Sequence, residues 1–202
     1  MKRPLNVKAA LSTITALLIF CFISSSAFSQ QVAMRTDLGN IVIELYPKKA
    51  PVTVSNFLKY VDSGFYNGTI FHRVIPGFVV QGGGLRFDFG RKETRDPIIN
   101  ESNNGLLNLR GTLSMARFSD PNSATSQFFI NLKHNTHLDP NQYNPGYTVF
   151  ARVVSGMEIV EKIVAEPRGL YRKHPDAPNA PVRILAAKRV STQNDSTTKK
   201  PN

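Results

Sequence analysis

Hydrophobic and polar residues alternate along the chain just after residue 30, which is the pattern of a strand with one buried face. Residues 32–36 alternate in this way, residues 41–45 are a second strand-like run with β-branched residues, and residues 37–40 between them are typical of a turn. The two segments therefore predict a β-hairpin near the start of the domain.

The spacing of apolar residues then changes to that of a helix. Four of them follow the i, i+3, i+4, i+7 rule: Val54, Phe57, Leu58 and Val61. Pro51 suits the first helical turn, and Gly64 is placed to end the helix in a left-handed conformation. These signals predict one amphipathic helix.

A second helix is expected shortly after residue 155. Residues 155–158 have the sequence Ser-Gly-Met-Glu, which matches a capping box beginning at Ser155. Met157, Val160 and Val164 would form its apolar stripe, and Pro167 lies just past its expected end.

The rest of the domain is rich in β-prone residues. The runs are short and separated by Gly and Pro turns: residues 69–75, 78–81, 112–116, 127–132, 148–154 and 182–190. Many short strands with only two helices favour a sandwich or a closed barrel, and the pattern does not choose between them.

The two ends of the chain differ from this domain. Lys2, Arg3 and Lys8 precede a mostly apolar, uncharged run at residues 9–23, and Ala27-Phe28-Ser29 fits a cleavage site. This is the layout of a secretory signal peptide, and the run of about 15 residues is short for a bilayer span of ~20. An uncleaved N-terminal anchor is the alternative. We expect a signal peptide at 1–29, a domain at 30–190 and a disordered polar tail at 191–202, in an exported, periplasmic protein with no stable membrane insertion after cleavage.

Charge and cysteine content exclude several classes of protein. The chain has 25 Lys and Arg against 14 Asp and Glu, but the basic residues are scattered rather than gathered in one run. They accompany no aromatic-rich nucleic-acid platform, so we expect no nucleic-acid partner. The single cysteine, Cys21, excludes a disulfide scaffold and a Cys-rich zinc module, and it would leave with the signal peptide.

One segment with candidate chemistry spans residues 71–84. Strand alternation would place Phe71, Arg73 and Ile75 on one side, and Val79 and Gln81 would share a side after the turn. An arginine backed by a glutamine in apolar surroundings is a preorganised donor aimed at a neutral acceptor. The alternative is an ordinary strand pair in which an acidic partner satisfies Arg73.

A second such segment spans residues 111–130. It contains many small residues, which would leave space for a bound chain, and Phe129 is placed to form the wall of an apolar slot. The alternative is a core strand following a surface loop.

Together these segments resemble the cyclophilin family of peptidyl-prolyl isomerases. The resemblance covers about residues 34 to 190, and it rests on FHRVIPGFVVQGGG at 71–84 and SQFFI at 126–130. The stretch from NGLLNLRGTLSMAR to SATSQFFIN is most similar to the bacterial periplasmic branch. The resemblance implies an eight-stranded antiparallel closed β-barrel capped by two α-helices, with the site on the outer face of the barrel.

The resemblance also implies the site residues. Arg73 would be the catalytic arginine, Gln81 would steady it, and Phe78 would belong to the proline pocket. The remaining implied substrate-binding residues are His72, Val79, Ala116, Arg117, Gln127, Phe129, Leu138 and Tyr147. Rotation about an X-Pro bond breaks no bond, so we expect no cofactor, no metal and no covalent intermediate.

Some positions depart from the family pattern. Val79 stands where Met is common, Arg117 where many members have Asn, and His137 where many eukaryotic members have Trp, so cyclosporin binding should be weak. His134 and His137 have an H-x-x-H spacing but are interpreted as surface-loop residues rather than metal ligands. We expect a monomer that acts on proline-containing polypeptides during folding. A binding module or chaperone without useful turnover is the alternative function.

Overall fold

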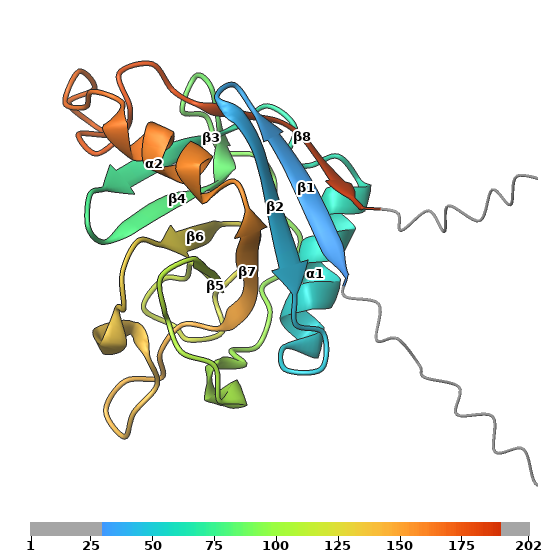
Figure 1. Cartoon of the computed structure of the whole chain (residues 1–202). Coiled ribbons are helices and arrows are strands. Elements are labelled where there is room, and N and C mark those ends of the chain that lie inside the picture. Colours follow the sequence, from blue (N-terminus) through green and yellow to red (C-terminus); the bar gives the residue numbers. More distant parts are fainter. Residues whose placement is uncertain (1–29, 191–202) are drawn as a thin grey trace, which may run out of the picture.

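Eight antiparallel strands close into a barrel in the order β1-β2-β7-β5-β6-β4-β3-β8 (Figure 1). The computed structural model describes residues 30–190, so the expected signal peptide and polar tail lie outside the described residues. The strands are β1 (Gln31–Thr36), β2 (Gly39–Leu45), β3 (Thr69–Ile75), β4 (Val79–Arg86), β5 (Thr112–Met115), β6 (Phe128–Asn131), β7 (Val149–Ser155) and β8 (Arg183–Arg189). The closed barrel is confirmed, and the sandwich is excluded.

Alternation in the strands fills the barrel interior. Val32 and Met34 of β1 are fully buried, and each stands opposite a fully buried isoleucine of β2, Ile43 and Ile41 respectively. Because side chains of a strand point alternately to its two faces, these pairs line the inside of the barrel. Their buried neighbours from the other strands and both helices form one continuous apolar core.

Helix α1 (Pro51–Asp62) forms as the apolar spacing predicts. Its Phe57 is fully buried and lies 5.9 Å, centroid to centroid, from the ring of Phe128 on β6. Gly64 has φ +67, and the amide of Phe65 donates to the carbonyl of Tyr60, which completes a Schellman end. The predicted stop at Gly64 is confirmed.

Helix α2 (Met157–Ala165) forms, but its predicted capping box is wrong. Ser155 is still part of β7 and pairs with Val42 of β2, so its side chain caps nothing. The N-cap is Gly156 with φ +93, and a Cβ there would lie 2.8 Å from the Cα of Ile41. Only glycine fits a left-handed position this close to a neighbouring strand. No helix among residues 30–190 is long and apolar enough to cross a membrane.

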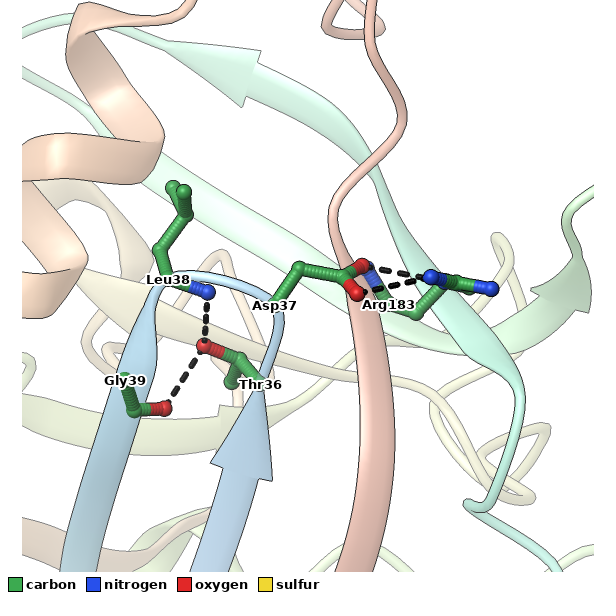
Figure 2. Close-up of polar contacts among 5 residues, drawn as sticks. All are labelled: Thr36, Asp37, Leu38, Gly39 and Arg183. Atoms are coloured by element: carbon green, nitrogen blue, oxygen red, sulfur yellow. Dashed lines mark hydrogen bonds and ion pairs between the residues drawn. The ribbon is translucent and has the colours of Figure 1, made fainter.

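The turn between β1 and β2 is tied to the start of β8, as Figure 2 shows. Thr36 Oγ1 accepts a hydrogen bond from the amide of Leu38 and donates one to the carbonyl of Gly39. Arg183 donates to Asp37 from its backbone amide at 2.7 Å and from Nη2 at 2.8 Å. The carboxylate therefore links the hairpin to the strand that closes the barrel.

This link makes stability dependent on pH. The hydrogen bonds from Arg183 lower the pKa of Asp37 from its ordinary value near 4. A lowered native pKa stabilises the fold fully above the ordinary value, and the contribution is lost as pH falls through the native value. In thermal unfolding at pH 7 and pH 3, we expect Asp37→Asn to show a smaller difference between the two pH values than the wild type. Asp96→Asn changes an exposed aspartate and is the control: its melting temperature should change between the two pH values as much as that of the wild type. If the melting temperature of Asp37→Asn also changed as much as that of the wild type, the stabilising role of the Asp37–Arg183 link would be contradicted.

Strand β3 contains an irregularity that positions the site. Phe71 pairs with Gly82 but Arg73 pairs with Gln81, so β3 advances by two residues while β4 advances by one. This is a β-bulge, and it breaks the alternation. Phe71 consequently lies in the barrel core while Arg73 lies on the outer face, so the expectation that they share a side is wrong. Strand β4 also runs on through the glycines to Arg86, beyond the predicted end at 81.

Candidate functional site

A second apolar cluster lies outside the barrel core. Val79 of β4, Phe129 of β6 and Leu138 form its buried centre, and Phe78, Ala116 and Tyr147 pack against it. Strands β4 and β6 are neighbours in the sheet (Figure 1), with Val79 opposite Asn131 and Phe129 opposite Gln81, so Val79 and Phe129 lie two register positions apart. All six of these residues are among those that the family resemblance assigns to the site, and the structure brings them together on one face.

Buried asparagines hold two walls of this cluster. The side-chain amide of Asn135 donates to the carbonyl of Phe78 at 3.0 Å and to Oδ1 of Asn131 at 2.8 Å. The backbone carbonyl of Asn135 in turn accepts from the amide of Leu138. Because buried polar groups are costly to leave unpaired, these bonds restrict the loop to one arrangement. Nothing in the local sequence pattern marks Asn135, so it was not among the predicted site residues.

The guanidinium of Arg73 is held from several sides beside the cluster. Its Nη1 donates to Oε1 of Gln81 at 3.2 Å, and its Nε lies 3.7 Å from Oδ2 of Asp176. Its central carbon lies 5.8 Å from the centroid of the Phe78 ring. Both interpretations of Arg73 from the sequence are therefore partly right: it has an amide support and an acidic partner. Asp176 was missed, because it lies far from Arg73 in the chain.

Gln81, which supports Arg73, is itself held by a hydrogen bond to Gln127. Nε2 of Gln81 donates to Oε1 of Gln127 at 3.0 Å, and the backbone carbonyl of Gln127 accepts from the amide of Ala116 at 2.9 Å. Gly84 leaves the room for this arrangement, because a Cβ there would lie 2.6 Å from Nε2 of Gln127. The run of hydrogen bonds thus fixes Gln81 in the orientation in which its carbonyl faces Arg73.

Gly84→Ala tests this arrangement. The added methyl group should displace Gln127 and release Gln81, and in the isomerase activity that the family resemblance implies it should lower kcat/KM by about three- to tenfold, the loss of roughly one hydrogen bond. Peptide turnover measures the loss of activity, and a thermal melt checks that the variant is still folded. In a Gln127→Ala background, the same substitution should have little further effect; an equal loss in both backgrounds would contradict the argument.

His72 precedes Arg73 on β3 and is partly buried. Burial lowers its pKa to about 4, opposed by a backbone hydrogen bond to Ile70, so the imidazole is neutral at pH 7. A neutral ring adds no positive charge beside the guanidinium.

Arg117 and Tyr147 form the far wall of the cluster. Nε of Arg117 donates to the carbonyl of Gly146 at 3.1 Å, and its guanidinium carbon lies 4.5 Å from the centroid of the Tyr147 ring. The Tyr147 ring meets Phe129 edge-on at 5.6 Å. Arg117 therefore fixes Tyr147, and Tyr147 fixes Phe129.

The site continues into a neighbouring hollow of about 260 Å³, which Gln81, Ala116, Arg117 and Gln127 help to line. On the other side, His137 stacks on the Phe78 ring with centroids 5.4 Å apart. Within residues 30–190, no group of three or more His, Cys, Asp or Glu side chains is placed to hold a metal ion. An apolar cluster joined to an open groove suits a polypeptide with an apolar side chain.

Known proteins are similar to this chain in both sequence and fold. The family model described as cyclophilin type peptidyl-prolyl cis-trans isomerase/CLD matches residues 31–189. The chain belongs to the cyclophilin family. This cyclophilin is a peptidyl-prolyl cis-trans isomerase: it is 50% identical over 185 residues to the peptidyl-prolyl cis-trans isomerase A of Dickeya dadantii, covering 92% of this chain and 97% of that one.

Other proteins similar to this chain are also peptidyl-prolyl cis-trans isomerases. The cyclophilin is 53% identical over 155 residues to a peptidyl-prolyl cis-trans isomerase of Acinetobacter baylyi, covering 77% of this chain and 82% of that one. A crystal structure of a Cryptosporidium parvum cyclophilin is similar with a TM-score of 0.67 and 30% identity, covering 81% of this chain and 99% of that chain. A further crystal structure of that protein, determined in the presence of the dipeptide Ala-Pro, has a TM-score of 0.66 and 30% identity, covering 80% of this chain and 99% of that chain.

Proposed function

We propose that the outer-face cluster is the site of catalysis and that Arg73 is its catalytic residue. The observation that carries this proposal is the placement of the Arg73 guanidinium, supported by Gln81, at the edge of an apolar cluster built around Phe129. A charged donor fixed beside an apolar slot is the arrangement that prolyl rotation requires.

The chemistry follows from the peptide bond itself. Amide resonance sets a rotation barrier of about 18–20 kcal/mol, and uncatalysed X-Pro isomerisation takes ~10–100 s. In the twisted state the imide nitrogen is pyramidal and its lone pair is free. Arg73 donates a hydrogen bond to that nitrogen, which stabilises the twisted state over both planar forms. An arginine suits this role because it stays charged and its donors form a rigid fork.

The apolar cluster holds the proline while the preceding residue rotates. Phe78, Val79, Phe129 and Leu138 contact the ring, and the backbone of Ala116 with the side chain of Gln127 faces the substrate chain in the neighbouring hollow. His72, Arg117 and Tyr147 complete the walls. The distinction from a simple binding module lies in Arg73 and Gln81, which apolar binding alone would not need.

The location of the site is tested by titrating the purified protein with a short Ala-Pro peptide and following backbone amide resonances. We expect the shifts to concentrate at Ala116, Gln127 and Phe129. Shifts concentrated instead along the exposed side of α1, for example at Lys59, would move the site elsewhere.

We further propose that the protein is exported and acts in the periplasm on prolines of other exported proteins, without stable membrane insertion. Support comes from the signal-peptide layout of residues 1–29. The mass of the protein recovered from a periplasmic fraction tests this, since cleavage after residue 29 would remove Cys21. An intact mass in the membrane fraction would favour the anchor.

We also propose that the protein is a monomer that binds cyclosporin weakly. The reason for weak binding is His137, which offers a smaller ring than the tryptophan of many eukaryotic members. It stacks on Phe78 at the edge of the cluster.

A further inference from the structure

Asp176 approaches Arg73 from the side opposite the glutamine. Its Oδ2 lies 3.7 Å from Nε of Arg73, while Gln81 accepts from Nη1 of the same guanidinium. The two partners thus occupy the Nε edge and one Nη1 proton, and neither contact uses Nη2. The side chains of Arg73 and Asp176 are 40% and 48% exposed, so the guanidinium remains reachable from solvent.

The segment that carries Asp176 is anchored on both sides of the carboxylate. The backbone carbonyl of Asp176 accepts from the amide of Val74, the residue next to Arg73 on β3, at 2.8 Å. The following residue, Ala177, is fully buried. Two residues earlier, the ring of His174 stacks on Phe89 with centroids 4.5 Å apart and planes 10° apart.

These anchors decide how the carboxylate acts. An exposed ion pair between two free side chains contributes little, because both must be ordered to form it. Here the loop between α2 and β8 holds the backbone of Asp176 against β3 by a hydrogen bond, so only the short aspartate side chain has to be ordered beside Arg73. Its effect is therefore to restrict the orientation of the guanidinium, which is the quantity that matters for a donor aimed at a developing lone pair.

We propose that Asp176 is a positioning residue for the isomerisation: it fixes the Nε edge of Arg73 and leaves Nη2 for the substrate. This inference rests on the proposed role of Arg73. The pairing should raise kcat, because it orders a donor used in the twisted state, and it should leave KM nearly unchanged, because the apolar cluster binds the proline ring.

Three variants test the proposal in a prolyl-peptide isomerisation assay on the purified protein. Asp176→Ala should lower kcat by about three- to fivefold, with KM within about twofold of the wild type. Asp176→Asn keeps the size of the side chain but removes the charge of the ion pair, so its loss should approach that of Asp176→Ala, whereas Asp176→Glu should recover part of the rate. All three variants keep the backbone hydrogen bond to Val74, so we expect them to fold like the wild type. A thermal melt checks this. The matched control is Asp62→Asn, which removes another aspartate–arginine pair, the one with Arg189, away from the site.

A spectroscopic readout separates positioning from a structural role. The Nε–H resonance of Arg73, identified by its absence in Arg73→Lys, should shift in Asp176→Ala and stay in place in Asp62→Asn. Wild-type kcat in Asp176→Ala, an unshifted resonance, or an equal loss in Asp62→Asn would each overturn the proposal. If Arg73→Ala itself keeps full activity, the proposed function of Arg73 fails first; if only Asp176→Ala keeps it, this inference alone fails.

Discussion

Replacing Arg73 by alanine is expected to lower kcat/KM for an X-Pro peptide by about 10²–10³-fold, the effect of removing one preorganised donor from a transition state. The loss should fall mainly on kcat, because the apolar cluster that binds the proline ring stays intact. Stopped-flow or exchange measurements of cis–trans interconversion provide both parameters. The fold should survive, since the Arg73 side chain is 40% exposed and lies outside the barrel core.

Two further variants define what Arg73 supplies. Arg73→Lys keeps the charge but not the planar fork, so it should recover little of the rate. Arg189→Ala removes an arginine of similar exposure that pairs with Asp62 away from the site, and it should turn over at the wild-type rate. Full activity in Arg73→Lys would show that charge alone suffices, and would contradict the geometric argument.

Phe129→Ala is expected to lower kcat/KM by about 30- to 100-fold, corresponding to the apolar contact that one phenyl ring makes with the substrate. Phe129 is 4% exposed at the centre of the cluster, so its removal opens the slot that holds the proline ring. That ring is bound in the planar and twisted states alike, and the loss should therefore appear mainly as a raised KM. Kinetics at several peptide concentrations separate it from the kcat effect of Arg73→Ala.

A phenyl ring elsewhere provides the control. Phe87→Ala removes a side chain that is 56% exposed and belongs to neither apolar cluster, so kinetics should be unchanged. Phe129→Leu keeps an apolar filling and should lose less than Phe129→Ala. A low-temperature assay guards against unfolding, because a buried Phe→Ala change costs about 3–5 kcal/mol. If Phe129→Ala were folded and its KM were unchanged, the substrate proline ring would not bind against Phe129, and the proposed pocket would be contradicted.

The sequence predicted most elements because their signals are local. Alternation in the first hairpin, the helical spacing from Val54 to Val61 and the glycine stop at Gly64 each depend on residues a few positions apart. The choice of a barrel over a sandwich came only from the family resemblance. Closure depends on the pairing of β1 with β8, which are far apart in the sequence and leave no periodic signal.

Errors arose where tertiary contacts override a local rule. Ser155 has a capping-box sequence, but pairing with Val42 keeps it in a strand. Phe71 and Arg73 should share a side by alternation, but a bulge against Gly82 separates them. The site residues beyond the family motifs, Asn135 and Asp176, are visible only once the chain is folded, because Phe78 and Arg73, which they contact, lie far from them in the sequence.

The most direct test of the account is cis–trans exchange in an Ala-Pro peptide, measured by NMR with the wild-type protein and with Arg73→Ala at equal concentration. The account predicts exchange far faster than the uncatalysed ~10–100 s with the wild type, and slow exchange with Arg73→Ala although the peptide still binds. Equal exchange rates with both proteins would contradict it.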